Sequence, residues 1–343
     1  MIRSAVTGPE RYGQGAGGPS VMARLAVRLV AGMAVVVLAS GCSDPLVIPT
    51  IEPVEAGLTD SYTPLAGIRI HAFNTGSIQS VEAAVWAGGS WTDTEAMEVF
   101  AFVIEHPKAG LVVFDTGLSP RAASDPGHYV GAIGRELGMV EASVGQDLPS
   151  QMREAGMNPD DVTLVVISHL HFDHTGTIED FPDAEVVIAA EEINAPRGEG
   201  LMPDFVFDDE FDQVSNWREL DYEKGEPLAT FVSHFDLIGD GSLLGVALSG
   251  HTAGSQGLLV RTDLGSVLLT GDAAWTEKSW RYAARPITAW SMAGWWEQAW
   301  RIRRYWQLAP RSLVIPGHDA AAVERSRSAV LISHRFGPSA LES

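Results

Sequence analysis

The sequence predicts a layered α/β domain, and three observations support that fold class. Short apolar runs, rich in β-branched residues, recur between residues 68 and 318 and are separated by turns. Segments with helical character lie at 148–157, at about 290–307 and after His318. A histidine or an aspartate stands at or just after the end of five apolar runs. Strands and helices that mix along a chain in this way pack as helices against sheets.

Nine apolar runs predict the strands of this domain. The continuous runs are long enough for strands whose two faces are both buried. In chain order they are residues 68–73, 99–104, 110–117, 162–168, 184–190, 242–250, 257–262, 266–272 and 312–318.

The residues before this domain have the layout of an export signal. Residues 22–42 combine Arg24 and Arg28 with the apolar run 29–38 and small residues before Cys42. The apolar run is too short to span a bilayer, which takes about 20 residues. The ending "LASGC" resembles the lipobox of bacterial lipoproteins, which implies lipidation at Cys42, an N-terminal lipid anchor and a place in the bacterial envelope facing the periplasm. The alternative is an ordinary signal peptide with a chance cysteine.

The flanking segments complete the predicted domain organisation. Residues 1–21 are Gly-rich and polar, so we expect an upstream extension, with translation starting at Met22. Residues 43–66 contain four prolines and are predicted to be a linker. The folded domain is expected at 67–336.

Composition excludes some partners and sites. The 343-residue chain has a formal net charge of −21, which argues against nucleic acid as a partner because phosphate binding depends on clustered Lys and Arg. The single cysteine allows neither an internal disulfide nor a thiolate metal cluster. We therefore expect a small-molecule substrate.

Two regions differ in composition from the rest of the chain. Residues 204–226 are strongly acidic with interspersed aromatics, which favours a solvated loop; the alternative is a lid over a site. Residues 290–306 carry five tryptophans, which favours a helix packed on the core; the alternative is an apolar wall that receives an acyl chain or a ring.

The polar residues at the strand ends predict a metal site with two ions. They are Asp115, His169, His251, Asp272 and His318. In "HLHFDH", His169 and His171 are two residues apart, so an extended segment points both toward one ion. Asp173 and His174 can serve a second ion. His251 and His318 can each complete one ion, and the two oxygens of Asp272 can bridge ions about 3.5–4 Å apart. The alternative is a set of hydrogen-bonded polar residues at strand ends.

These residues resemble the signature of the metallo-β-lactamase superfamily, His-X-His-X-Asp-His followed by separate His, Asp and His motifs. The resemblance covers about residues 67–325 and implies an αββα four-layer sandwich. It implies that His169, His171 and His251 hold the first metal, that Asp173, His174 and His318 hold the second, and that Asp272 bridges. It also implies that Asp115, in "FDTG", supports the site from behind the ligands.

The donors are all nitrogen and oxygen. Two divalent ions are expected, with zinc favoured and iron, manganese or cobalt also compatible. Ser168, Thr270 and Asp319 are candidates to orient the ligands.

The site predicts hydrolysis, in which a metal-bridging hydroxide attacks a carbonyl or phosphoryl centre. The ligand motifs lie about 77, 21 and 46 residues apart, and this spacing resembles the N-acyl-homoserine lactonase group. "GLVVFDTGLSP" and "SGHTAGSQGLLV" resemble the same group. A thioesterase similar to glyoxalase II is the alternative enzyme, and an envelope protein that binds metal without turnover is the alternative outside enzymes.

One position departs from the lactonase pattern. Lactonases of that group place a tyrosine three residues after the bridging aspartate, and this chain has Trp275. Asp173, Asp272 and Trp275 are the predicted catalytic residues.

Overall fold

The computed structural model describes residues 65–196, 205–328 and 330–334. The predicted extension, signal, Cys42 anchor and most of the linker therefore lie outside the described residues. The described strands and helices run from Arg69 to His334, inside the predicted 67–336 domain. No helix in the described ranges has both the length and the apolar character needed to cross a membrane.

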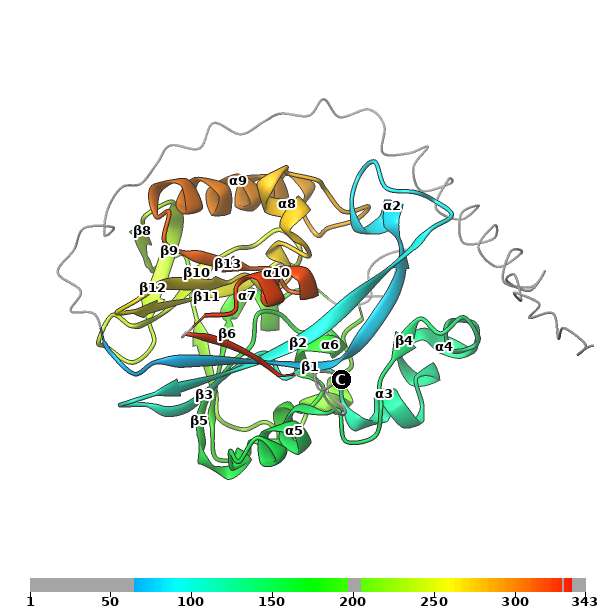
Figure 1. Ribbon diagram of the computed structural model, residues 1–343, viewed down its shortest axis with the longest axis horizontal. Coiled ribbons are helices and arrows are strands. Elements are labelled where there is room, and N and C mark those ends of the chain that lie inside the picture. Colours follow the sequence, from blue (N-terminus) through cyan, green and yellow to red (C-terminus); the bar gives the residue numbers. More distant parts are fainter. Residues whose placement is uncertain (1–64, 197–204, 329, 335–343) are drawn as a thin grey trace, which may run out of the picture. The chain divides into compact units, whose positions relative to one another are not determined.

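The strands form two sheets (Figure 1). The first has the order β14-β1-β2-β3-β5-β6-β7, with β4 paired to β1. Its strands are β1 (Arg69–Val81), β2 (Thr94–His106), β3 (Gly110–Phe114), β4 (Val140–Glu141), β5 (Val162–Val166), β6 (Glu185–Ala189), β7 (Trp217–Leu220) and β14 (Leu331–His334).

The second sheet has the order β13-β12-β11-β10-β9-β8. Its strands are β8 (Glu226–Leu228), β9 (Phe231–Asp236), β10 (Leu243–Ala247), β11 (Gln256–Thr262), β12 (Gly265–Leu269) and β13 (Leu313–Ile315). Neighbours are antiparallel except β12 and β13, which are parallel.

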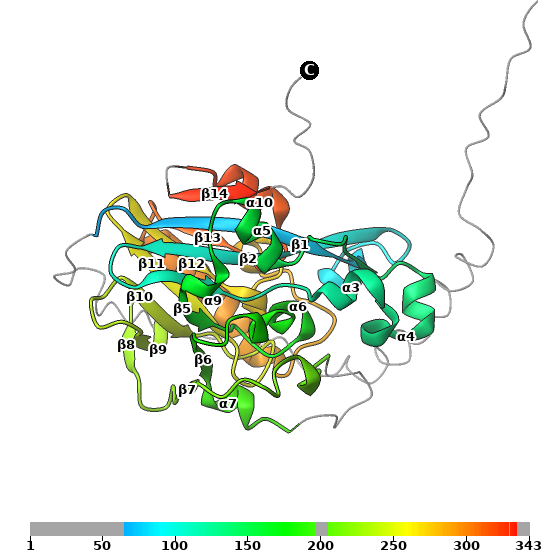
Figure 2. The same cartoon turned by 90° about the horizontal axis from the view of Figure 1, so that it is seen from below.

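The helices are short apart from one. They are α2 (Glu82–Val85), α3 (Pro120–Ser124), α4 (Gly127–Glu136), α5 (Leu148–Glu154), α6 (Phe172–Thr175), α7 (Ala190–Ile193), α8 (Glu277–Arg281), α9 (Met292–Leu308) and α10 (Ala320–Arg325). In Figure 2, α3, α4 and α6 lie toward the same end of the sheets.

Alternating side chains along the strands create the layers. Val112 and Phe114 of β3 belong to the core between the two sheets, whereas Val113 belongs to a second core beneath α5. Leu258 and Leu259 of β11 divide in the same way between the inner core and a third core beneath α9. Because successive strand side chains point to opposite faces, strands covered on both faces are apolar throughout.

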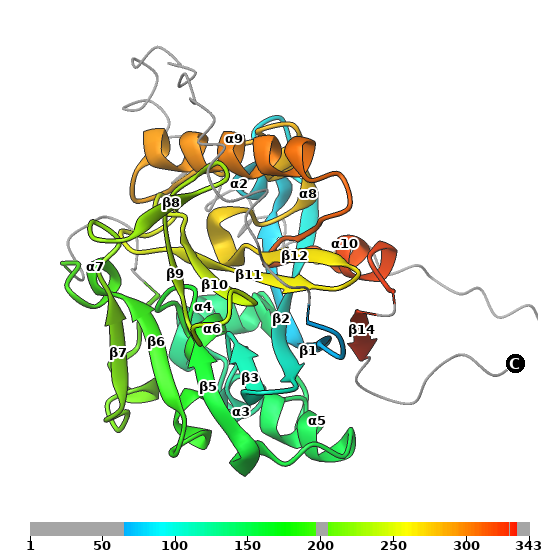
Figure 3. The same cartoon turned by 90° about the vertical axis from the view of Figure 1, so that its left-hand side faces the viewer.

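The predicted αββα sandwich is therefore confirmed. Figure 3 shows α9 on the outer side of one sheet and α5 on the outer side of the other. Met152 of α5 and Ile302 of α9 are fully buried against their sheets.

All nine predicted strands are present, and so are the three predicted helical segments. The loop prediction for 204–226 is wrong in part, because residues Trp217–Leu220 form edge strand β7 and pair with β6. Strand β9 was not predicted. Its sequence, "FVSHFD", has one exposed and three half-buried positions with polar residues among them, so it lacks the continuous apolar run of its neighbours.

Candidate dinuclear metal site

The predicted ligands lie in loops at one edge of the paired sheets. β3, β5 and β6 are parallel, so their carboxyl ends meet at the same edge. Asp115 follows β3 directly, and Ser168 and His169 follow β5. Loops after β10, β12 and β13 bring in the ligands from the second sheet.

A single turn of helix reverses the chain within "HLHFDH". His171 has extended backbone angles and precedes α6, and the main-chain N–H groups of His174 and Thr175 both donate to the His171 carbonyl. Asp173 and His174 are thereby turned inward, where both are buried.

The first group is formed by three imidazole nitrogens. His169 Nε2 and His171 Nδ1 lie 2.9 Å apart, and His251 Nε2 is 3.2 Å from each. Nitrogens that share a tetrahedral zinc ion at about 2.0–2.1 Å lie about 3.3 Å from one another. The separations in this group therefore fit a common cation.

The second group combines two imidazoles with carboxylate oxygens. Asp173 Oδ2 lies 3.4 Å from His174 Nε2 and 3.6 Å from His318 Nε2. Asp173, His174 and His318 are all buried, and their ligand atoms lie within 4.8 Å of one another.

Asp272 lies between the two groups. Its Oδ1 is 2.9 Å from His318 Nε2 and 3.3 Å from His174 Nε2. Its Oδ2 is 3.3 Å from His251 Nε2 and 3.9 Å from His169 Nε2. One carboxylate thus faces both groups, as a bridging ligand must.

Close backbone packing brings Asp272 to this position. Gly271 has φ +49°, and a Cβ there would lie 2.5 Å from Ser168 Cβ. Gly317 faces the carboxylate from the other side, and a Cβ on it would lie 2.6 Å from Asp272 Oδ1. These two glycines let the β5, β12 and β13 loops meet around Asp272.

Three of the imidazole rings are oriented by hydrogen bonds from Nδ1 to residues outside the two ligand groups. Asp115 Oδ2 is 2.8 Å from His174 Nδ1, the Glu98 carbonyl is 2.9 Å from His318 Nδ1, and Ser168 Oγ is 3.0 Å from His169 Nδ1. Asp115 and the Glu98 carbonyl are acceptors, so each fixes an N–H on Nδ1, and in the neutral ring the free lone pair is then on Nε2, toward the interior.

The structure places Asp115 and Ser168 behind the ligands, as expected, whereas Thr270 and Asp319 form side-chain hydrogen bonds with main-chain groups in the described part of the chain. Thr270 Oγ1 donates to main-chain carbonyls, the nearest being that of Gly271 at 2.9 Å. Asp319 Oδ1 accepts from the main-chain N–H of Ala322 and caps α10. Both residues hold the backbone that carries Asp272 and His318, because polar side chains beside a loop also satisfy main-chain groups.

Glu192 was missed by sequence reasoning. It is buried, and its carboxylate accepts from the main-chain N–H groups of Leu170 at 3.1 Å and Gly254 at 2.8 Å. It therefore ties the loop of His169 and His171 to the loop of His251. Nothing in "AAEEI" distinguishes it from Glu191, because its role depends on two segments far away in sequence.

Trp275 contacts the predicted ligands directly. Its Nε1–H donates to Asp272 Oδ2 at 2.8 Å, and its ring meets the His251 ring edge-on at 5.7 Å. The main-chain N–H of His318 donates to the Trp275 carbonyl at 2.9 Å. That Trp275 takes part in catalysis stays a prediction.

The electrostatics of the two groups differ. Burial, and then the neighbouring imidazoles, hold the pKa of His169 well below its usual range, and burial lowers the pKa of His251 to about 3. Burial also disfavours charge on His174 and His318, but nearby carboxylates outweigh it and raise the pKa of both. His318 and His174 in turn overcome the effect of burial on Asp272 and hold its pKa well below the usual range. The first group thus presents neutral imidazoles, and the second attracts positive charge.

The residues fit two divalent cations. Five imidazoles and two carboxylates converge, and within the described residues the buried His174 Nε2 and Asp272 Oδ1 have no hydrogen-bond partner. Buried polar atoms without a partner are costly unless something binds them. That these groups hold ions remains a prediction, as do the individual ligand assignments.

Aromatic residues lie beside the site. The Phe205 ring, in the acidic segment, is 6.2 Å from the His171 ring, and the Phe205 carbonyl accepts from the main-chain N–H of Phe172. The main-chain N–H of Trp290 donates to the His251 carbonyl, while its side chain is 59% exposed. Trp295 of α9 is fully buried, which supports core packing for that residue. Trp290 lies before the helix and is the exposed member of the group.

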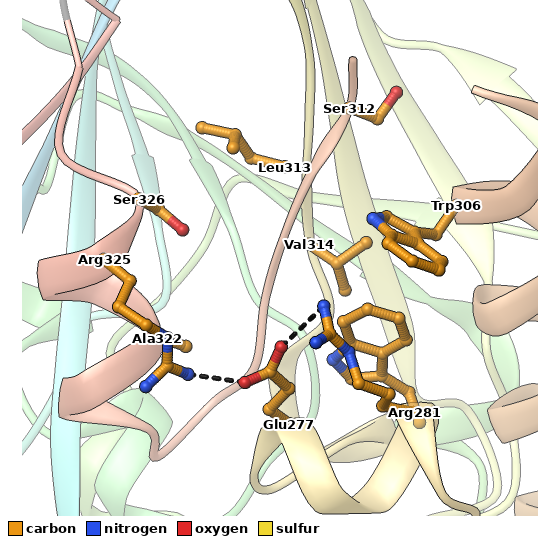
Figure 4. A pocket seen from close by; sticks show the side chains of 10 residues that line it. Glu277, Arg281, Trp306, Ser312, Leu313, Val314, Ala322, Arg325 and Ser326 are labelled. Carbon is orange, nitrogen blue, oxygen red and sulfur yellow. Dashed lines mark hydrogen bonds and ion pairs between the residues drawn. The ribbon is translucent and has the colours of Figure 1, made fainter. Parts of the chain in front are cut away.

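An ion-pair network braces the loops of Trp275 and His318 from outside. Figure 4 shows Glu277 between Arg281 and Arg325. The Glu277 carboxylate is 2.8 Å from Arg281 Nη2 and 2.5 Å from Arg325 Nη2, which joins α8 to α10. The Glu277 main-chain N–H donates to Asp319 Oδ2 at 2.8 Å. The segment after Trp275 is thus held against the segment after His318.

Comparison with known proteins finds N-acyl homoserine lactonases among the relatives of this chain. An N-acyl homoserine lactonase AttM of Azorhizobium caulinodans is 31% identical over 269 residues, covering 75% of this chain and 95% of the relative. The AttM of Agrobacterium fabrum is 29% identical over 266 residues, with the same two coverages.

Solved structures show the same fold. An N-acyl homoserine lactone hydrolase with N-hexanoyl-L-homoserine bound at its catalytic metal centre superposes with a TM-score of 0.63 at 19% identity, covering 76% of this chain and 97% of that one. The dizinc lactonase AidC gives a TM-score of 0.51 at 15% identity, covering 75% and 90%.

The profile of the metallo-β-lactamase superfamily matches residues 95–318, which include every ligand of both groups. The fold, the two groups of ligand-type residues and these similarities together show that the chain belongs to the metallo-β-lactamase superfamily.

Proposed function

We propose that the protein is a dinuclear metal-dependent hydrolase that opens the ring of N-acyl homoserine lactones. The observation that carries this proposal is the buried Asp272, with one oxygen toward each of two groups of ligand-type side chains. Similarity to lactonases over 95% of the relative's length supports the substrate class.

Zinc is the proposed metal, because imidazole and carboxylate donors suit it well. The ions would be held by His169, His171 and His251 in one group and by Asp173, His174 and His318 in the other, with Asp272 between them. When bound, two such ions supply polarisation of a substrate carbonyl and a lowered pKa for an attacking water.

The chain's own residues set up this chemistry. Asp115 and the Glu98 carbonyl fix the proton of the neutral His174 and His318 rings on Nδ1, so that Nε2 is the nitrogen available to a cation. The Phe205 ring lies 6.2 Å from the His171 ring, and the exposed Trp290 has a backbone contact with His251, so both are candidates to offer apolar surface to an acyl chain. The net charge of −21 has little effect on the binding of a neutral lactone. It repels the carboxylate that ring opening creates, which favours release of the product.

The test is a substrate panel with zinc-loaded protein, read as acid release in a pH-stat. Acyl homoserine lactones of several chain lengths should be hydrolysed faster than a thioester, a β-lactam or a phosphodiester. Asp272→Ala should abolish the activity while circular dichroism confirms the fold. Faster turnover of the thioester than of every lactone would replace this proposal with a glyoxalase II-like one, and no turnover of any substrate would support metal binding without catalysis.

We also propose that the protein is exported and lipid-anchored at Cys42. The support is the signal layout of residues 22–42 and the resemblance of "LASGC" to a lipobox. Mass spectrometry of the mature N-terminus tests this. A diacylated peptide that begins at Cys42 is expected, and an unmodified peptide that continues through Cys42 would contradict it.

A further inference from the structure

Trp275 has one side-chain donor, and that donor is already engaged. An indole offers a single N–H and no acceptor. Here the N–H lies on Asp272 Oδ2 at 2.8 Å. To donate to a substrate carbonyl, Trp275 would have to release Asp272, so its contribution must act through that carboxylate.

The oxygen that it contacts faces the first of the two groups. Oδ2 points toward His251 and His169, at 3.3 and 3.9 Å. Oδ1 points toward His318 and His174, at 2.9 and 3.3 Å. The carboxyl torsion of an aspartate is broad, so a carboxylate turns more easily when one of its oxygens lacks a fixed donor. The indole N–H therefore selects one orientation of Asp272.

Trp275 is itself fixed on several sides. Its carbonyl accepts from the His318 N–H, and its ring packs edge-on against His251. Two residues further on, Glu277 is held by the ion pairs drawn in Figure 4. The donor thus belongs to a braced segment and not to a mobile side chain.

We propose that Trp275 is a positioning residue that locks the rotation of Asp272, so that Oδ2 serves the first group and Oδ1 the second. This proposal rests on the proposed function only for the identity of the reaction. Its central consequence concerns metal binding and is measured without any substrate.

The experiment compares Trp275→Phe with wild type by titrating metal-free protein with zinc against a competing chelator. Removing an outer partner of a ligand lowers metal affinity by about 10- to 100-fold. We expect that loss at one of the two stepwise sites, because Oδ2 is the Asp272 oxygen that lies nearest to His251 and His169 of the first group. The other site should change little. Cobalt-loaded protein should show the same asymmetry in its visible spectrum.

Two further variants make the result specific. Trp275→His retains a five-membered ring with an N–H donor and should restore much of the lost affinity. Trp280→Phe removes another buried indole, which has no hydrogen-bond partner within the described ranges, and should leave both zinc constants unchanged.

Unchanged zinc constants in Trp275→Phe would overturn the proposal. So would an equal loss in Trp280→Phe, or a Trp275→His variant as weak as Trp275→Phe. A protein that follows the expected metal pattern but hydrolyses no lactone would leave this assignment standing and refute the proposed function alone.

Discussion

Asp115→Asn is expected to remove metal from the second group by changing the tautomer of His174. Asp115 accepts three hydrogen bonds: Ser168 N–H at 2.6 Å on Oδ1, and Ser168 Oγ and His174 Nδ1 at 2.8 Å on Oδ2. The amide oxygen of asparagine must take the place of Oδ1, because the Ser168 main-chain N–H can only donate. The amide NH₂ then faces His174 Nδ1. That nitrogen must become the acceptor, so the ring proton moves to Nε2, the atom turned toward the second group.

The magnitude follows from the same contacts. A hydrogen bond to a charged group is worth about 1.5–3 kcal/mol, so the metal-free variant should lose about that much free energy of unfolding. Loss of the outer partner that holds the His174 proton on Nδ1 should lower the zinc affinity of the second group by about 10- to 100-fold. The backbone should not change, since Asp115 has φ +56° and asparagine tolerates that region well.

Elemental analysis after equilibrium dialysis against a zinc buffer measures the bound metal, and ¹⁵N chemical shifts of the His174 ring report the tautomer. Asp147→Asn is the matched control, because Asp147 caps α5 and asparagine caps helices equally well. Two tightly bound zinc ions in Asp115→Asn, with the proton still on Nδ1, would refute the reasoning.

Three other outcomes are expected. Burial is the main cause that raises the pKa of Glu210 to about 7, so the native state still holds a proton that the unfolded state releases from about pH 4.5 upward. Stability should therefore fall by up to about 3 kcal/mol between about pH 4.5 and pH 7 and then level off. Urea unfolding at pH 5 and pH 8 should show this fall, and Glu210→Gln should remove it; an equal fall in that variant would assign it to another group. Gly317→Ala places a methyl group 2.6 Å from Asp272 Oδ1, so less than two zinc ions per chain should remain after dialysis, and full occupancy would show that the loop can shift. Trp295→Ala should cost about 3–5 kcal/mol in free energy of unfolding because the side chain is 1% exposed. Trp290→Ala should stay within about 0.5 kcal/mol because that side chain is 59% exposed, and similar losses in the two variants would contradict the burial argument.

The sequence identifies the residues that converge at this site well and the residues that support them poorly. "HLHFDH" and the residues after three later strands are recognisable because they stand at fixed places relative to apolar runs. The inner strands are equally clear because both of their faces are buried. Edge strand β7 and strand β9 are half exposed and contain polar residues, so they lack the apolar pattern from which a strand is predicted.

The supporting contacts depend on tertiary neighbours that no local pattern encodes. Glu192 meets main-chain groups of Leu170 and Gly254, which lie 22 and 62 residues away. The Glu98 carbonyl reaches His318 across 220 residues. Thr270 and Asp319 were expected beside ligand side chains and instead hold the backbone, because the sequence places a residue near a site without giving the direction of its side chain.

The distribution of the ligands between the two sheets has a consequence for the lifetime of the protein. His169, His171, Asp173 and His174 follow a strand of one sheet, and the remaining three follow strands of the other. Cations bound by both sets would cross-link the halves of the sandwich, and a ligand present at 100 times its dissociation constant adds about 2.7 kcal/mol to the free energy of unfolding. The free zinc concentration around the protein would then determine how often the two sheets separate by unfolding. A chelator would act as a denaturant, and resistance to proteolysis would report metal availability before any loss of turnover was measured.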